Sequence, residues 1–121
     1  MMADAEPPDW LTDEPDATVR SLPGSFRLTD LGNAERLVAR YRDRIRYCQQ
    51  RRKWLLWDGT RWRWDDTAAI ERVAKSTVRD ILLEAHAAGG KEGQAISDHA
   101  FRSEAAKRIR DMVALAQSEE G

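Results

Sequence analysis

Apolar positions recur every three or four residues in three parts of the chain, a spacing that is typical of amphipathic helices. They predict helices over about 31–42 and over about 67–87, the second having the clearest helical pattern in the chain. The third part, 94–118, is either one helix or two. Three glycines within 87–93 predict a flexible connector between the last two helical parts, because glycine stops a helix.

Short polar side chains stand where these helices are expected to begin. Their oxygen atoms can accept hydrogen bonds from the free amides of a first helical turn. A carboxylate there is also favoured by the helix dipole. The capping candidates are Thr29, Asp30 and Asn33 for the first helix, Asp65 and Asp66 for the second, and Ser103 for a new start within the third part.

Between the first two helices the apolar pattern changes to a period of two, which is the strand period. Strands are predicted at 45–48, 53–57 and 61–64. Asp58-Gly59 lies between the last two and is a strong hairpin signal, because a type I′ turn needs positive φ at both central residues. The fold predicted is α+β and mainly helical, with a two- or three-stranded antiparallel β-meander packed against two or three long helices.

The register of the hairpin decides which side chains share a face of the sheet. Trp62 and Trp64 share one face in either register, and the two arginines of the third strand share the other. A two-residue loop adds Trp57 to the tryptophan face, whereas a three-residue loop adds Trp54 instead. Burying a tryptophan is strongly stabilising, so we expect Trp62 and Trp64 in the core and the arginines in solvent.

A neutral total charge hides one basic segment. The net charge of the whole chain is −1, but residues 25–64 carry +7, flanked by −5 in 1–24 and −3 in 65–121. Four of the five tryptophans lie in this basic segment. Cations can contact phosphates and aromatic rings can stack on bases. The candidate nucleic-acid-binding residues are therefore Arg51, Arg52, Lys53, Trp54, Trp57, Arg61 and Arg63. A solvated basic face without a ligand is the alternative.

The sequence offers no group of residues suited to catalysis. It has no glycine-rich phosphate loop followed by lysine, and His86 and His99 stand apart on predicted helices. Cys48 is the single cysteine and is expected to be a small apolar side chain on a strand. We expect neither an enzyme nor a metal or cofactor site. No stretch approaches the ~20 apolar residues of a membrane span.

All four prolines lie in the first 28 residues, together with most of the N-terminal acids. Residues 1–28 are expected to form a disordered acidic arm, and residues 29–121 a single domain. The apolar pair Trp10-Leu11 within the arm either packs weakly or serves as a short docking motif.

Four segments, in this order, carry a family resemblance: LTDLGNAERLVARYRDRIRY, KWLLWDGTRWRWDDT, IERVAKSTVRDI and FRSEAAKRIRDMVALAQSEEG. Together they resemble the N-terminal helical domain of phage and plasmid primase–helicases of the poxvirus-type NTPase group. The first two segments in combination are specific, whereas a lone WDG hairpin is common. The resemblance runs from about Leu28 to Gly121.

The resemblance implies a non-catalytic accessory domain in phage or prophage DNA replication, in the cytoplasm of a bacterial host. The expected partners are single-stranded or forked DNA and a superfamily-3 helicase module, in cis or in trans. The domain would contact DNA or support assembly of the helicase ring. The alternatives are a protein-docking module of the replisome and a truncated prophage remnant, the chain being an excised domain or a truncated gene product.

Overall fold

The computed structural model describes residues 26–119. In chain order it contains helix α1 (Asp30–Tyr41), strands β1 (Ile45–Cys48), β2 (Lys53–Trp57) and β3 (Trp62–Trp64), and helices α2 (Ala69–Ala88), α3 (Gly90–Arg102) and α4 (Ala106–Ala116). The predicted α+β, mainly helical fold is confirmed. Apart from residues 26–28, the predicted arm with Trp10 and Leu11 lies outside the described residues.

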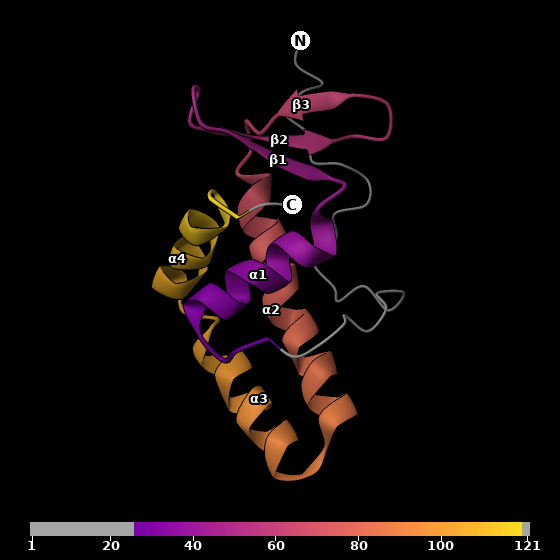
Figure 1. Cartoon of the computed structure of the whole chain (residues 1–121), viewed down its shortest axis with the longest axis vertical. Helices are drawn as coiled ribbons and strands as arrows, with labels where there is room; N and C mark the ends of the chain where they lie inside the picture. The colour runs from indigo at the N-terminus through magenta and orange to yellow at the C-terminus, as the bar shows by residue number, and fades with distance from the viewer. Residues whose placement is uncertain (1–25, 120–121) are drawn as a thin grey trace.

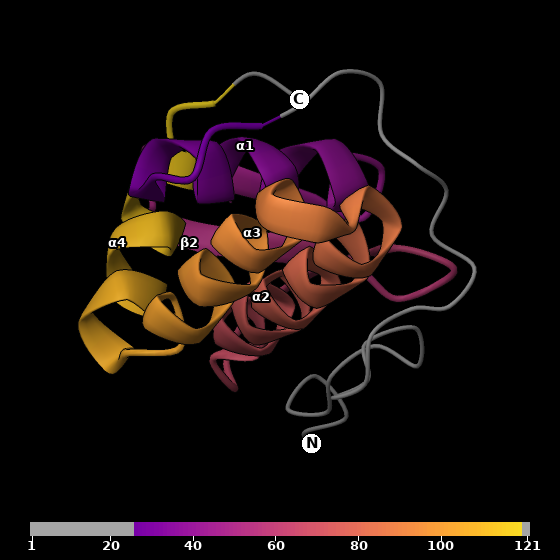
Figure 2. The ribbon, with the colours of Figure 1, turned by 90° about the horizontal axis from the view of Figure 1, so that it is seen from below.

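The sheet lies at one end of the molecule and the helices extend away from it (Figure 1). Its strands are antiparallel in the order β1-β2-β3. Helix α2 leads away from the sheet and α3 returns beside it, which the view from below shows as well (Figure 2). None of the helices within residues 26–119 combines the length and apolarity needed to cross a membrane.

Two of the predicted caps are present. The Thr29 hydroxyl accepts a hydrogen bond from the Gly32 amide at 2.9 Å, which starts α1. The Asp65 carboxylate accepts from the amides of Ala69 and Ile70 at 2.8 and 2.9 Å. Helix α2 nevertheless begins two residues later than predicted, because Ala68 adopts a left-handed backbone with φ of 58°.

The predicted flexible connector after α2 is wrong. Gly89 alone separates α2 from α3, and its φ of 68° lets the chain reverse within one residue. Gly93 permits the close approach of the two helices, because a Cβ there would lie 2.5 Å from the Ala85 carbonyl oxygen. The three glycines thus build a tight helical hairpin.

The third helical part is two helices, but Ser103 does not cap the second. It lies fully buried between α3 and α4 and donates its hydroxyl hydrogen to the His99 carbonyl oxygen at 2.8 Å. Helix α4 starts after Ala105, without a side-chain cap.

One apolar cluster joins the sheet to three helices. Its members are side chains that meet beneath one face of the sheet, namely Ala34, Leu37, Val38 and Tyr41 of α1, Ile45, Trp54 and Leu56 of the sheet, Ala69, Ile70, Val73, Ala74 and Val78 of α2, and Ile109, Met112 and Ala116 of α4. None of the described residues of α3 belongs to this cluster. The sheet is therefore fixed by α1, α2 and α4.

Buried polar contacts hold α3 to α1. Asn33 donates from Nδ2 to the Ser103 hydroxyl at 2.9 Å and accepts at Oδ1 from Nε2 of His99 at 2.8 Å. Arg36 also donates to this Oδ1, at 3.2 Å. Since arginine only donates, Oδ1 must be the amide oxygen and His99 must carry its hydrogen on Nε2. Burial and the nearby arginines, Arg36 first among them, lower the pKa of His99 below its usual value.

Candidate nucleic-acid interface

The β2–β3 loop is longer than either predicted form. Trp57 pairs with Trp62, which leaves four residues, Asp58 to Arg61, in the loop. The Asp58 carboxylate explains this length, since its Oδ1 accepts from the amides of Thr60 and Arg61, both at 2.8 Å. These two bonds lower the pKa of Asp58. Gly59 takes positive φ but Asp58 does not, so a type I′ turn is not formed.

A four-residue loop places the side chains of β2 and β3 on the same faces as a two-residue loop does, because the two loops differ by an even number of residues. Trp62 and Trp64 share a face, as predicted, and Trp57 joins them. We call this the outer face of the sheet, and its members are Arg46, Cys48, Lys53, Leu55, Trp57, Trp62 and Trp64. The opposite, inner face carries Ile45, Tyr47, Trp54, Leu56 and Arg63.

The prediction that Trp62 and Trp64 lie in the core is wrong. The helices pack against the inner face, so Trp54 fills the core beside Tyr47, with their ring centroids 5.1 Å apart. Trp64 is 36% exposed, and Trp62 is only partly buried. The tryptophans of β3 thus lie on the surface that faces away from the helices.

The arginines of the hairpin also differ from the prediction. Arg63 points to the inner face at the sheet edge, is half-buried, and pairs with the Asp58 carboxylate. Arg61 belongs to the loop and is exposed, as expected. Arg61 and Arg63 therefore do not share a face of β3, although both predicted registers placed them on one face.

Guanidinium groups lie over two of the outer tryptophan rings. Arg46, on β1, reaches across β2 so that its Cζ lies 4.7 Å from the ring centroid of Trp62 on β3. Arg51, in the β1–β2 turn, lies 5.6 Å from the ring centroid of Trp64. Trp57 meets Trp62 edge-to-face at 5.5 Å. Each exposed cation–π contact contributes ~0.5–1 kcal/mol, less than the ~1–3 kcal/mol of a stacked base.

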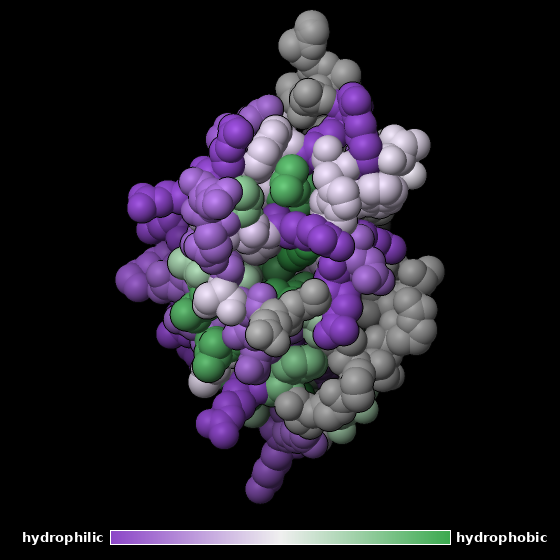
Figure 3. All heavy atoms as spheres, turned by 45° about the horizontal axis from the view of Figure 1, so that its top comes forward, coloured by the Kyte–Doolittle hydropathy of each residue, from purple (hydrophilic) through white to green (hydrophobic). Residues whose placement is uncertain are grey.

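Most predicted phosphate-binding residues surround this outer face. Arg51, Arg52, Lys53 and Arg61 are all exposed, in the two loops and at the start of β2. Lys53 lies 3.8 Å from Asp66, in an exposed ion pair that adds little stability. Figure 3 turns this end towards the viewer, and pale side chains of intermediate hydropathy gather there among purple, hydrophilic ones.

One predicted site residue, Trp54, and two arginines of the basic segment do not reach this surface. Trp54 is buried and offers no ring face to a ligand. The side chains of Arg36 and Arg40, two cations of the +7 segment, are buried on α1 and contact the Glu84 carboxylate at 2.9 and 3.4 Å. Part of the +7 segment is thus neutralised inside the fold. Sequence reasoning missed Arg46, although its alternation with Ile45 and Tyr47 on β1 places it on the outer face.

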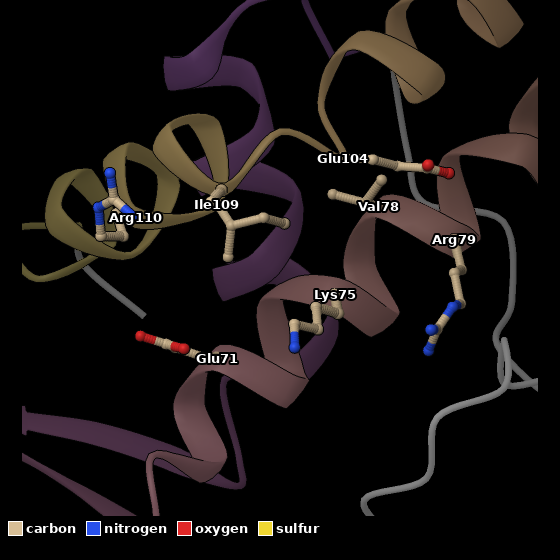
Figure 4. A pocket seen from close by; sticks show the side chains of 8 residues that line it. Glu71, Lys75, Val78, Arg79, Glu104, Ile109 and Arg110 are labelled. Carbon is tan, nitrogen blue, oxygen red and sulfur yellow. The ribbon is translucent and has the colours of Figure 1, made fainter.

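A hollow of about 400 Å³ lies between α2 and α4 (Figure 4). Acidic and basic side chains both line it, and the charged ends of Glu104, Arg79 and Arg110 lie at separate corners. Because these side chains carry both signs of charge and point in different directions, the hollow does not favour one kind of ligand. Within residues 26–119, no group of three or more His, Cys, Asp or Glu side chains is placed to hold a metal ion.

Comparison with known proteins connects this fold to a family. The model of the family described as D5 N terminal like matches residues 34–119, which is most of the described chain. No curated protein and no solved structure gives a significant match. The resemblance seen in the sequence is thereby confirmed. The chain belongs to the D5 N-terminal-like family, the N-terminal domain of D5-like phage and plasmid primase–helicases, and it is a primase–helicase-associated domain and not itself the catalytic helicase module.

Proposed function

We propose that this domain binds single-stranded or forked DNA next to the helicase module of a primase–helicase, present in cis or in trans, in the cytoplasm of a bacterial host. The observation that carries the proposal is the cluster of exposed cations around the outer face of the sheet. The domain itself would be non-catalytic and would hold the strand beside the helicase ring.

The phosphate-binding cations are Arg51, Arg52, Lys53 and Arg61. They lie in the two loops and at the adjoining start of β2, where their side chains are exposed. Their contact with phosphates is independent of sequence and weakens steeply with salt. The negative net charge of the whole chain does not oppose this, because screening limits distant charges to a Debye length of about 10 Å at 0.1 M salt.

A salt titration of DNA binding tests the proposal. The fluorescence anisotropy of a labelled oligo(dT) is measured for the wild type and for a variant carrying Arg51→Gln, Arg52→Asn, Lys53→Gln and Arg61→Gln. Asparagine is chosen at position 52 because Arg52 has a positive φ of 54°. We expect weaker binding and a log–log salt slope that is smaller by about 0.7 for each lost phosphate contact on a single strand.

A matched control removes four exposed charges from the helices. Lys75→Gln, Lys91→Gln, Arg102→Gln and Arg110→Gln change the net charge by the same amount, at helical positions outside the sheet and its loops. The control should keep most of the affinity and the salt slope. Equal losses in both variants, or no binding by the wild type in low salt, would refute the proposed surface.

A protein-docking role is the second candidate, and exposed apolar side chains on the helices favour it. Phe101 is 60% exposed, Leu31 49% and Leu115 37%. These residues would contact the helicase module or another replisome protein. Phe101→Ser together with Leu31→Ser would then abolish co-elution with the helicase module in size-exclusion chromatography and leave DNA affinity unchanged. Unchanged co-elution would exclude this surface.

A further inference from the structure

We propose that the outer face of the sheet carries two base-stacking positions, one on Trp62 and one on Trp64, which select unpaired bases. The inference rests on the proposed function, since it assigns a second kind of contact to the same DNA-binding surface. The surface would then distinguish single-stranded from double-stranded DNA, in addition to binding phosphates.

The contacts of the two rings show that a flat group fits on each. The guanidinium of Arg46 lies over Trp62 at 4.7 Å, and that of Arg51 lies over Trp64 at 5.6 Å. A planar cation at these distances occupies a ring face that no packed core residue covers. Both arginines are exposed and come from β1 and the β1–β2 turn.

A base can take the place of each guanidinium. Base–aromatic stacking is stronger than an exposed cation–π contact, so the exchange is favourable. The displaced arginine then lies within reach of the phosphates that flank the base, where it forms a charge-assisted contact. Arg46 and Arg51 would therefore change partner, from ring to phosphate, when a strand binds.

The spacing of the rings selects single strands. Trp62 and Trp64 are two residues apart on β3, about 7 Å along the strand. Successive phosphates of one strand in a duplex advance by only about 3.4 Å along the helix axis. Neighbouring bases that occupy both rings must therefore be unstacked from each other, as they can be in a single strand. Stacking is tolerant of sequence because every base has a π-face.

Trp57 has a supporting role in this arrangement. It meets the Trp62 ring edge-to-face at 5.5 Å and pairs with Trp62 across β2 and β3. This contact fixes the Trp62 ring from the side of β2. Leu55 stands directly opposite Trp64 in the same way.

Oligonucleotides without bases separate stacking from phosphate contact. Binding of a labelled oligo(dT) of about eight nucleotides, within the usual site size of small single-strand-binding domains, is compared with an abasic oligonucleotide of equal length and charge. For the wild type we expect oligo(dT) to bind at least about tenfold more tightly. A hairpin duplex with the same number of phosphates should bind like the abasic strand.

The tryptophan variants complete the test. Trp62→Leu with Trp64→Leu should remove the preference for oligo(dT) and leave the affinity for the abasic strand unchanged. Trp62→Phe with Trp64→Phe keeps two rings and should retain part of the preference. Phe101→Leu, at an exposed aromatic residue on α3 away from the sheet, is the matched control and should retain all of it.

The outcomes distinguish this inference from the proposed function. Equal binding of oligo(dT) and the abasic strand, or a preference that survives in the double leucine variant, overturns the stacking positions and leaves phosphate binding intact. A preference that Phe101→Leu also removes overturns them too. Absence of binding to either strand in low salt overturns both proposals. Circular dichroism of each variant establishes that it is folded.

Discussion

At the scale of single residues, the tryptophans of the hairpin have two different environments. Trp54 is buried among residues of the main core and touches Tyr47, whereas Trp64 is on the outer face and 36% exposed. The stability of the fold therefore depends on Trp54 much more than on Trp64.

Replacing Trp54 by alanine should destabilise the protein far more than replacing Trp64. We expect Trp54→Ala to lower the free energy of unfolding by about 3–5 kcal/mol, the usual loss for a large buried side chain. Trp64→Ala should cost about 1 kcal/mol, because much of its ring already contacts water. Urea denaturation of the two variants measures the difference. A larger loss for Trp64→Ala would contradict the assignment of the two faces.

His99 should make stability depend on pH in the range just below its ordinary pKa of 6.5. Its pKa in the folded state is lowered, by burial first and then by Arg36, Arg102 and Arg108, while Asp30 opposes the shift. In this range the unfolded chain binds more protons than the folded one, so the free energy of unfolding rises with pH. It should therefore fall as the pH is lowered from 7.5 to 5.

His99→Gln provides the control for this pH effect. Glutamine can still donate to Asn33 Oδ1 but does not titrate. The difference in unfolding free energy between wild type and variant should therefore change with pH in favour of the variant as the pH falls. A difference that stays constant between pH 7.5 and 5 would show that His99 does not cause the dependence.

The sequence predicted which residues of the hairpin share a face, but not which face is buried. Strand parity placed Trp62 and Trp64 together, and that is confirmed. The face with more tryptophans was expected inside because it has the larger apolar area. Burial is decided instead by the neighbouring elements, since Ile45 and Trp54 meet α1, α2 and α4. Such long-range packing is not contained in a local pattern.

At the scale of elements, the helical hairpin of α2 and α3 depends on a close approach of backbones. Gly93 faces the Ala85 carbonyl at a distance that leaves no room for a side chain. The sequence predicted both helices and the glycine-rich break, but glycine serves flexibility, tight turns and close packing alike. The sequence pattern alone does not show which of these three roles a given glycine has.

Gly93→Ala should destabilise the protein although alanine is the better helix former. The new Cβ would lie 2.5 Å from the Ala85 oxygen. Overpacking of this kind costs about 1–3 kcal/mol, against a propensity gain of about 1 kcal/mol. Thermal unfolding measures the net effect, with Lys91→Ala on the exposed side of α3 as a control that should be near neutral. A rise in the melting temperature of Gly93→Ala would contradict the close packing.

At the scale of the whole molecule, the two ends are stabilised by different interactions. The sheet end shares the apolar cluster with α1, α2 and α4, to which α3 contributes none of its described residues. The other end relies on few apolar side chains, such as Ile81 and Ala100, and on the buried contacts of Asn33 and Arg36. The order of elements followed from the sequence, whereas this division did not, because it arises from contacts between distant segments.

Hydrogen exchange should reveal this division. Amides in the second half of α2 and in α3 should exchange with solvent faster than those of β2 and the first half of α2. Local opening needs less free energy where fewer apolar contacts are lost. Exchange measured by NMR residue by residue tests this, and uniform protection along α2 would contradict it.

The four-residue loop from Asp58 to Arg61 also restricts how this domain can vary in nature. Removing or adding one residue there would turn Arg63 outward and bring Trp64 inward, which exchanges the two surfaces of β3. A change of two residues restores the original orientation. Insertions and deletions tolerated at this site should therefore come in even numbers. Whether the loop length of a relative is even or odd would then indicate which face of its β3 strand is exposed.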